Sequence, residues 1–94
     1  MSEESLQPVE VGLVLAEMVQ VLAEISWQKL GLRADAMTGV TKRDLPQAKL
    51  AIDAACQLAD LMTPQLDDAD KRSIQKITTD LRLNFVQQKE LAGE

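Results

Sequence analysis

Residues 9–30 read VEVGLVLAEMVQVLAEISWQKL, and this stretch decides the fold of the 94-residue chain. Its pattern lacks the alternation of a strand and predicts one long helix. At 100° per residue, the polar side chains of this helix gather in one arc of about 40°. They are Glu10, Glu17, Glu24 and Gln28. Nearly every other position is apolar, so the apolar surface is about twice as wide as the stripe of a little over 100° that a surface helix needs.

The apolar surface of this helix is larger than the rest of the chain can bury. Two further helices can cover one side of it, and each large side chain left in water forfeits about 1.5–3 kcal/mol. Four or five such residues would cost about as much as the whole stability of a small domain. We therefore expect a second protein surface, most simply that of a symmetric homodimer. The expected interface residues are Val11, Leu15, Met18, Leu22, Ile25 and Trp27. The alternative is a monomeric bundle in which the following loop folds over the helix.

Glycine and capping signals divide the remaining chain into two more helices. Gly31 is suited to the left-handed residue that ends the first helix, with Leu32 folding back onto the last turn. The joint over residues 31–43 is long for a helix–helix connection and is expected to pack Leu32 or Met37. Asp44 is a good N-cap for the second helix, which Thr63-Pro64 should end. The apolar residues of this helix are spaced by three and four: Leu45, Ala48, Ile52, Ala55, Ala59 and Met62.

The second joint is short, so the second and third helices should form an antiparallel hairpin. Asp67 is the expected N-cap of the third helix, which should fray after Gln88. Its core stripe is Ile74, Ile77, Leu81 and Phe85. The prediction is an all-α chain: a three-helix bundle with a long apolar first helix, completed by dimerisation. One domain over residues 9–90 would lie between tails at 1–8 and 91–94.

Composition excludes several kinds of chemistry. Fifteen acidic residues against ten basic ones give a net charge of −5, which disfavours nucleic acid and anionic membranes. There is no histidine, and Cys56 alone cannot form a disulfide within the chain. The glutamates of the first helix would be costly in a bilayer, so no membrane insertion is expected. These features favour a cytoplasmic location with a reduced thiol.

No motif for catalysis or for a cofactor is apparent. The cluster Asp67-Asp68-Ala69-Asp70 lacks the ligand spacing of a calcium loop and is explained by helix capping. Cys56 lies in mid-helix with no histidine to activate it. We therefore expect no enzyme, no metal and no cofactor, but an interaction module that self-associates or binds a partner helix. The alternative function is a carrier of small apolar ligands with a pocket lined by Met18, Trp27, Met37 and Met62.

The order of several short motifs resembles a bacterial family of small helical proteins, domain of unknown function 1844. The motifs are Leu30-Gly31, Thr38-Gly39, Asp44-Leu45, Ala48-Lys49, Ile52-Asp53, Leu58, Leu66, Leu81-Arg82 and Phe85-Val86. The resemblance covers about residues 10–87 and implies a bacterial cytoplasmic protein, with no assigned activity. The usual Lys-Thr-x-Gly-Asn stretch of the family is replaced here by Leu61-Met62-Thr63-Pro64-Gln65.

Two charged residues of these motifs lead to one structural hypothesis. Asp53 and Arg82 belong to the two best-matching dipeptides, in the second and third helices. We expect them to form an ion pair that fixes the register of the hairpin. The alternative is two independent solvated charges.

Overall fold

The computed structural model describes residues 7–93 and contains three helices joined by two connections of very different length. The elements are α1 (Val11–Lys29), α2 (Leu45–Met62), the 3₁₀ turn η2 (Thr63–Gln65) and α3 (Asp68–Leu91). No strand occurs within the described residues, so the prediction of an all-α chain with three helices is confirmed. Residues 1–6 of the predicted N-terminal tail, and residue 94 of the C-terminal tail, lie outside the described residues.

The N-caps of α2 and α3 are those that the sequence predicts. The Asp44 carboxylate accepts a hydrogen bond from the backbone N–H of Gln47, at 3.2 Å. The Asp67 carboxylate accepts one from the backbone N–H of Asp70, at 2.8 Å. Each cap satisfies a donor that has no partner inside its helix. By contrast, α1 begins two residues later than expected, at Val11, and has no side-chain cap.

The predicted glycine stop at the end of α1 is also confirmed. Gly31 has φ +79°, and its N–H donates to the carbonyl of Gln28 at 3.0 Å. The N–H of Leu32 donates to the carbonyl of Trp27 at 3.1 Å. This pair of bonds is a Schellman motif, in which glycine adopts the left-handed conformation without a Cβ penalty.

Replacing Gly31 with alanine should destabilise the fold more than the same change at Gly39. Both residues have positive φ, which costs an L-residue about 1–2 kcal/mol. A Cβ at Gly31 would also lie 3.1 Å from the Cβ and 3.3 Å from the Cα of Arg43, whereas a Cβ at Gly39 would meet open space. Urea unfolding of both variants measures the difference. Equal losses would contradict a steric role for the contact with Arg43.

The second helix ends at Thr63-Pro64 as predicted, and α3 ends after Gln88 as expected. Thr63 keeps a helical conformation although Pro64 follows it, so the chain tightens into η2 after Met62 rather than breaking. The helix α3 continues past Gln88 to Leu91, because the first left-handed residue after it is Gly93. Proline at the second position of a 3₁₀ turn needs no N–H donor, which explains why the turn accepts it.

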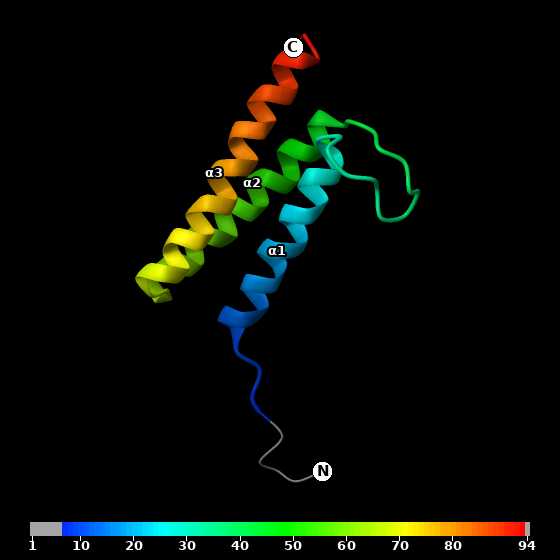
Figure 1. Ribbon diagram of the computed structural model, residues 1–94. Helices are drawn as coiled ribbons and strands as arrows, with labels where there is room; N and C mark the ends of the chain where they lie inside the picture. Colours follow the sequence, from blue (N-terminus) through cyan, green and yellow to red (C-terminus); the bar gives the residue numbers. More distant parts are fainter. Residues whose placement is uncertain (1–6, 94) are drawn as a thin grey trace.

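The three helices form an open layer and not a closed bundle (Figure 1). The central helix α2 packs against α1 on one side and α3 on the other, while α1 and α3 have little contact. The molecule measures 56 × 31 × 18 Å. Its radius of gyration is 15.8 Å, against about 12 Å for a compact domain of this length. The chain therefore leaves much of α1 uncovered.

The core lies where the end of α1 meets α2 and the middle of α3. Its buried residues are Ala23, Leu30, Leu45, Ala48, Ile52, Cys56 and Leu81. Trp27, Ile77 and Phe85 are partly buried against this cluster. The hydroxyl of Ser26, fully buried in α1, donates to the Leu22 carbonyl at 2.7 Å and so leaves no polar atom without a partner.

Candidate interaction surface

The apolar residues of α1 divide into a small buried face and a larger exposed one. The buried residues of the helix, Val19, Ala23 and Ser26, lie within an arc of about 60°. On another face, five large apolar residues are 37–68% exposed and lie within an arc of about 80°. They are Val11, Val14, Met18, Val21 and Ile25, and we call them the α1 seam. The seam faces about 130° away from the buried arc.

The α1 seam has the spacing of a coiled-coil interface. Its residues follow one another by three, four, three and four positions, which is a heptad repeat with Val11, Met18 and Ile25 at a and with Val14 and Val21 at d. In a soluble protein, an apolar stripe with this period is normally covered by another helix. Within residues 7–93 no helix lies there, because α2 packs against another face of α1.

The two flanks of the seam differ in chemistry. Glu10, Glu17 and Glu24 recur every seven residues and occupy the g positions along one edge. All three are exposed. The other edge has Leu15 and Leu22 at e positions, both partly buried. The surface is thus an apolar stripe with a carboxylate border on one side and an apolar border on the other.

The structure places most of the predicted interface residues here, but not all. Val11, Met18 and Ile25 lie on the seam, and Leu15 and Leu22 lie beside it. Trp27 lies on a different face, where it packs against the core. The prediction missed Val14 and Val21, although the heptad spacing of the other three residues points to both positions.

Trp27 is held in place by neighbours in the chain. The guanidinium of Arg33 lies over its ring, 5.9 Å from the centroid, and forms an ion pair with Glu24. A cation over an indole face is attracted by the ring quadrupole. The tryptophan therefore closes the side of the core next to the loop and is not an anchor of the α1 seam.

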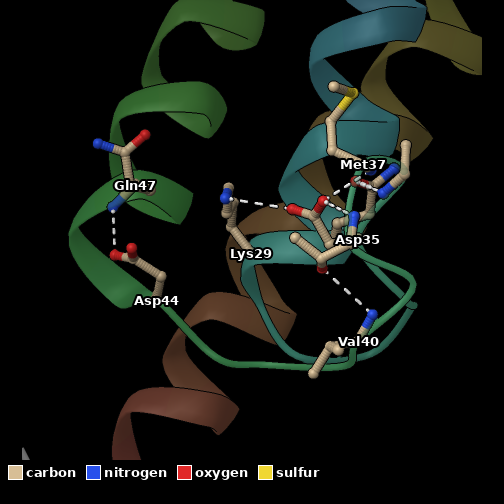
Figure 2. Close-up of polar contacts among 9 residues, drawn as sticks. Lys29, Asp35, Met37, Val40, Asp44 and Gln47 are labelled. Atoms are coloured by element: carbon tan, nitrogen blue, oxygen red, sulfur yellow. Dashed lines mark hydrogen bonds and ion pairs between the residues drawn. The ribbon is translucent and has the colours of Figure 1, made fainter.

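The loop between α1 and α2 is held at the end of α1 by polar contacts, several of which Figure 2 shows. The Asp35 carboxylate accepts hydrogen bonds from the backbone N–H groups of Met37 and Thr38, at 2.8 and 3.0 Å, and pairs with Lys29 at 3.5 Å. The two backbone hydrogen bonds are the main cause that lowers the pKa of Asp35. The hydrogen bond and the positive charge of Lys29 lower this pKa further. The N–H of Ala36 donates to the side-chain oxygen of Gln28. Local polar bonds thus hold the loop at the end of α1.

This loop overturns one expectation. The sequence predicts that the long joint packs Leu32 or Met37, but Met37 is 94% exposed and Leu32 is 45% exposed. The loop is shaped by the Asp35 turn and not by an apolar anchor, because the carboxylate can satisfy two backbone donors without one. The alternative of a loop folded over the first helix is not seen, since the α1 seam stays exposed.

A groove opens between the first half of α1 and the junction of α2 with α3. It has a volume of about 430 Å³ and is lined mainly by apolar residues, including Leu15, Ala16, Met62, Leu66 and Ile74. Of the four residues predicted to line a ligand pocket, only Met62 lines this groove. Met18 lies on the seam, Trp27 against the core, and Met37 in solvent. The structure therefore does not assemble the predicted carrier pocket.

The predicted pair of Asp53 and Arg82 is not formed within residues 7–93. The Asp53 carboxylate lies 2.6 Å from the ammonium of Lys49, one turn earlier in α2. Asp53 and Arg82 do line one shallow groove between α2 and α3, together with Ile52 and Phe85. The nearer partner on the same helix takes the carboxylate, so an interhelical pair does not set the register.

Cys56 and the acidic residues were also candidates for chemistry. Cys56 is buried in the core, and this burial raises the pKa of its thiol and disfavours the reactive thiolate. Its surroundings are those of a packing residue. Among the described residues, no three acidic, cysteine or histidine side chains come together as a metal site would require.

The helix α1 also has the length and hydropathy of a helix that could cross a membrane. Only 22% of the relevant window is buried, so this is not the buried core helix of an ordinary soluble domain. Glu17 and Glu24 lie within the helix, and a central charge costs about 2.5–3.5 kcal/mol on insertion scales.

These features define a small all-α domain with an unpartnered apolar helix face. Comparison with family models identifies the domain of unknown function DUF1844 over residues 13–87. The match covers most of the chain, so the protein belongs to the DUF1844 family, as its motifs suggested. Neither the curated proteins nor the solved structures contain a match to the chain.

Proposed function

We propose that this protein is a non-enzymatic interaction module that associates with protein through the α1 seam. The observation that carries the proposal is the exposure of five large apolar side chains in a heptad pattern on one helix. Monomeric soluble proteins rarely leave a continuous apolar patch of this kind in water. Covering each such side chain contributes about 1.5–3 kcal/mol. A protein that binds the seam would therefore bury a large apolar area, and this burial would favour binding.

The carboxylate border of the seam favours protein over lipid as its cover. A helix that lies on a membrane surface typically has lysine and arginine on its polar face, whereas Glu10, Glu17 and Glu24 border the seam. Anionic headgroups would repel these carboxylates. A helix from another protein chain can bury the apolar stripe and leave the carboxylates in water. The cytoplasmic location expected from the sequence stays a prediction.

The apolar-ligand alternative has less support. A carrier site encloses 70–90% or more of its ligand. The groove beside α1 is partly open to solvent and has the acidic residues Glu10 and Asp70 among its lining. An exposed heptad seam, by comparison, is a feature that helical partners recognise directly.

The orientation of the other two helices is part of the same proposal. We infer an antiparallel α2–α3 hairpin, which presents α1 on one side of the layer. Two contacts support it: η2 joins the helices through Thr63–Gln65, and the Arg43 guanidinium before α2 donates to the side-chain oxygen of Gln88, at 2.9 Å, near the end of α3. The hairpin acts as a support that leaves the seam free to associate.

The experiment is sedimentation velocity over a wide range of concentration. The native chain is expected to sediment as an oligomer, and Met18→Glu to sediment as a monomer, because it places a charge in the centre of the seam. The matched control is Leu50→Glu, a similar change at an exposed site on α2, which should sediment like the native chain. A native chain that stays monomeric at high concentration would contradict self-association. Flotation of that monomer with lipid vesicles would assign the seam to a membrane.

A further inference from the structure

We propose that the occupant of the α1 seam is a second copy of this chain, and that the two α1 helices run parallel as a two-stranded coiled coil. This inference rests on the proposed function and adds the identity and direction of the partner. It is carried by the heptad pattern of the seam and by the different chemistry of its two flanks.

The open layout of the fold favours a partner that is always present. The radius of gyration of 15.8 Å, against about 12 Å for a compact domain, shows how little of its own surface the chain covers. Exposed residues occupy the seam along nearly the whole of α1. A second copy of the chain is the partner most readily available to bury this apolar surface, because it is made at the same time and in equal amount.

The residues of the seam suit self-pairing of two helices. Val11 and Ile25 at a positions are β-branched, as in parallel two-stranded coiled coils, although Val14 and Val21 stand at the d positions where such pairs usually have leucine. A two-fold axis along the helices would place each seam residue opposite itself. Met18 at the central a position is flexible enough to pack against its own copy. The seam faces away from α2, so the two hairpins would lie on the outside of the pair.

The border of glutamates distinguishes the two possible directions. In an antiparallel pair, the two-fold axis crosses the helices and brings the g flank of one helix against the g flank of the other. Glu10, Glu17 and Glu24 of both copies would then share one edge, and like charges would repel along its full length. Arg33 pairs with Glu24 and offsets the repulsion at that end of the edge, whereas Glu10 and Glu17 have no ion pair among the described residues.

A parallel pair avoids this conflict. There the g flank of one helix meets the e flank of the other, five residues further along. Glu10 and Glu17 would lie across Leu15 and Leu22 of the second copy, so their methylene groups cover the leucines and their carboxylates stay in water. Glu24 would lie across Lys29 of the second copy, an opposite charge. The charge pattern therefore favours the parallel direction over the antiparallel one.

Disulfide trapping tests the direction. Single cysteines are placed at the two d positions, Val14→Cys and Val21→Cys, in a chain that also contains Cys56→Ala to remove the native thiol. A parallel pair places each new cysteine opposite its own copy, within the 4.4–6.8 Å between Cα atoms that a disulfide spans. Each variant alone is expected to form a linked dimer under mild oxidation. The matched control is Leu83→Cys, an exposed apolar site on α3 that should stay monomeric.

The other outcomes each have a defined meaning. In an antiparallel pair each d position faces an a position of the second copy, so linkage only when Val14→Cys or Val21→Cys is mixed with Met18→Cys indicates that direction, which overturns this inference and leaves the proposed function standing. Linkage of all three variants at one rate reports random collision and overturns the inference. A chain that is monomeric by sedimentation and shows no linkage overturns this inference, and leaves association with a different protein as the remaining form of the proposed function. Circular dichroism of each variant confirms that the helices are retained.

Discussion

Replacing Leu81 with alanine is expected to lower the free energy of unfolding by about 2–5 kcal/mol. Leu81 is fully buried and is the residue by which α3 enters the core cluster. Its removal takes apolar surface from that cluster and leaves a cavity that the neighbouring side chains fill only in part. The free energy of unfolding of a whole domain is about 5–15 kcal/mol, so the variant should be marginally folded at best.

Urea unfolding followed by circular dichroism measures this loss. The matched control is Leu83→Ala, two residues further along α3, where the side chain is 54% exposed. We expect its effect to be small, because surface substitutions usually change stability by about 0.5 kcal/mol or less. A loss at Leu83 as large as that at Leu81 would show that the exposed face of α3 is covered in solution.

The second large effect is expected from Ala55→Leu. Ala55 is fully buried in α2, the helix that packs against both others. Small residues recur on the buried side of this helix: Ala48, Ala51, Ala55 and Ala59. A larger side chain at such a position forces neighbours off their rotamers or moves a helix, at a cost of about 1–3 kcal/mol.

Thermal unfolding of Ala55→Leu tests whether the close approach of helices to α2 matters. Ala69→Leu is the matched control, because this residue is exposed in the first turn of α3 and the added groups meet no packed neighbour. The control should melt close to the native chain, and Ala55→Leu well below it. If Ala55→Leu melts at the same temperature as the native chain, the helices packed around Ala55 leave enough space for a larger side chain.

The helix boundaries that the sequence predicts well are those set by local chemistry. Asp44 and Asp67 cap their helices, and Gly31 ends α1 in the left-handed conformation, as expected. Each of these features depends on hydrogen bonds within a few residues, so the pattern of residues is enough to identify it. The end of α3 is predicted only to lie after Gln88, because its last turns contain no strong stop signal before Gly93, and the helix ends at Leu91.

Features that depend on spatial neighbours were harder to predict. The excess of apolar residues in α1 indicated an exposed face, but the direction of α2 decides which residues it contains. The sequence leaves two places open for Trp27, the interface or the core, and the structure packs it against the core. Asp53 pairs with Lys49 and not with Arg82, because a lysine one turn away competes with a partner on another helix. Val14 and Val21 could have been found from the heptad spacing alone.

The layout of one central helix with two flanking neighbours also bears on how the chain folds. Helices that are adjacent in sequence are adjacent in space, while the first and the last have little contact. Most native contacts therefore close short loops, which gives a low contact order and predicts folding in microseconds to milliseconds. The pair α1–α2 can form before α3 is present, so assembly can proceed in chain order as the protein leaves the ribosome.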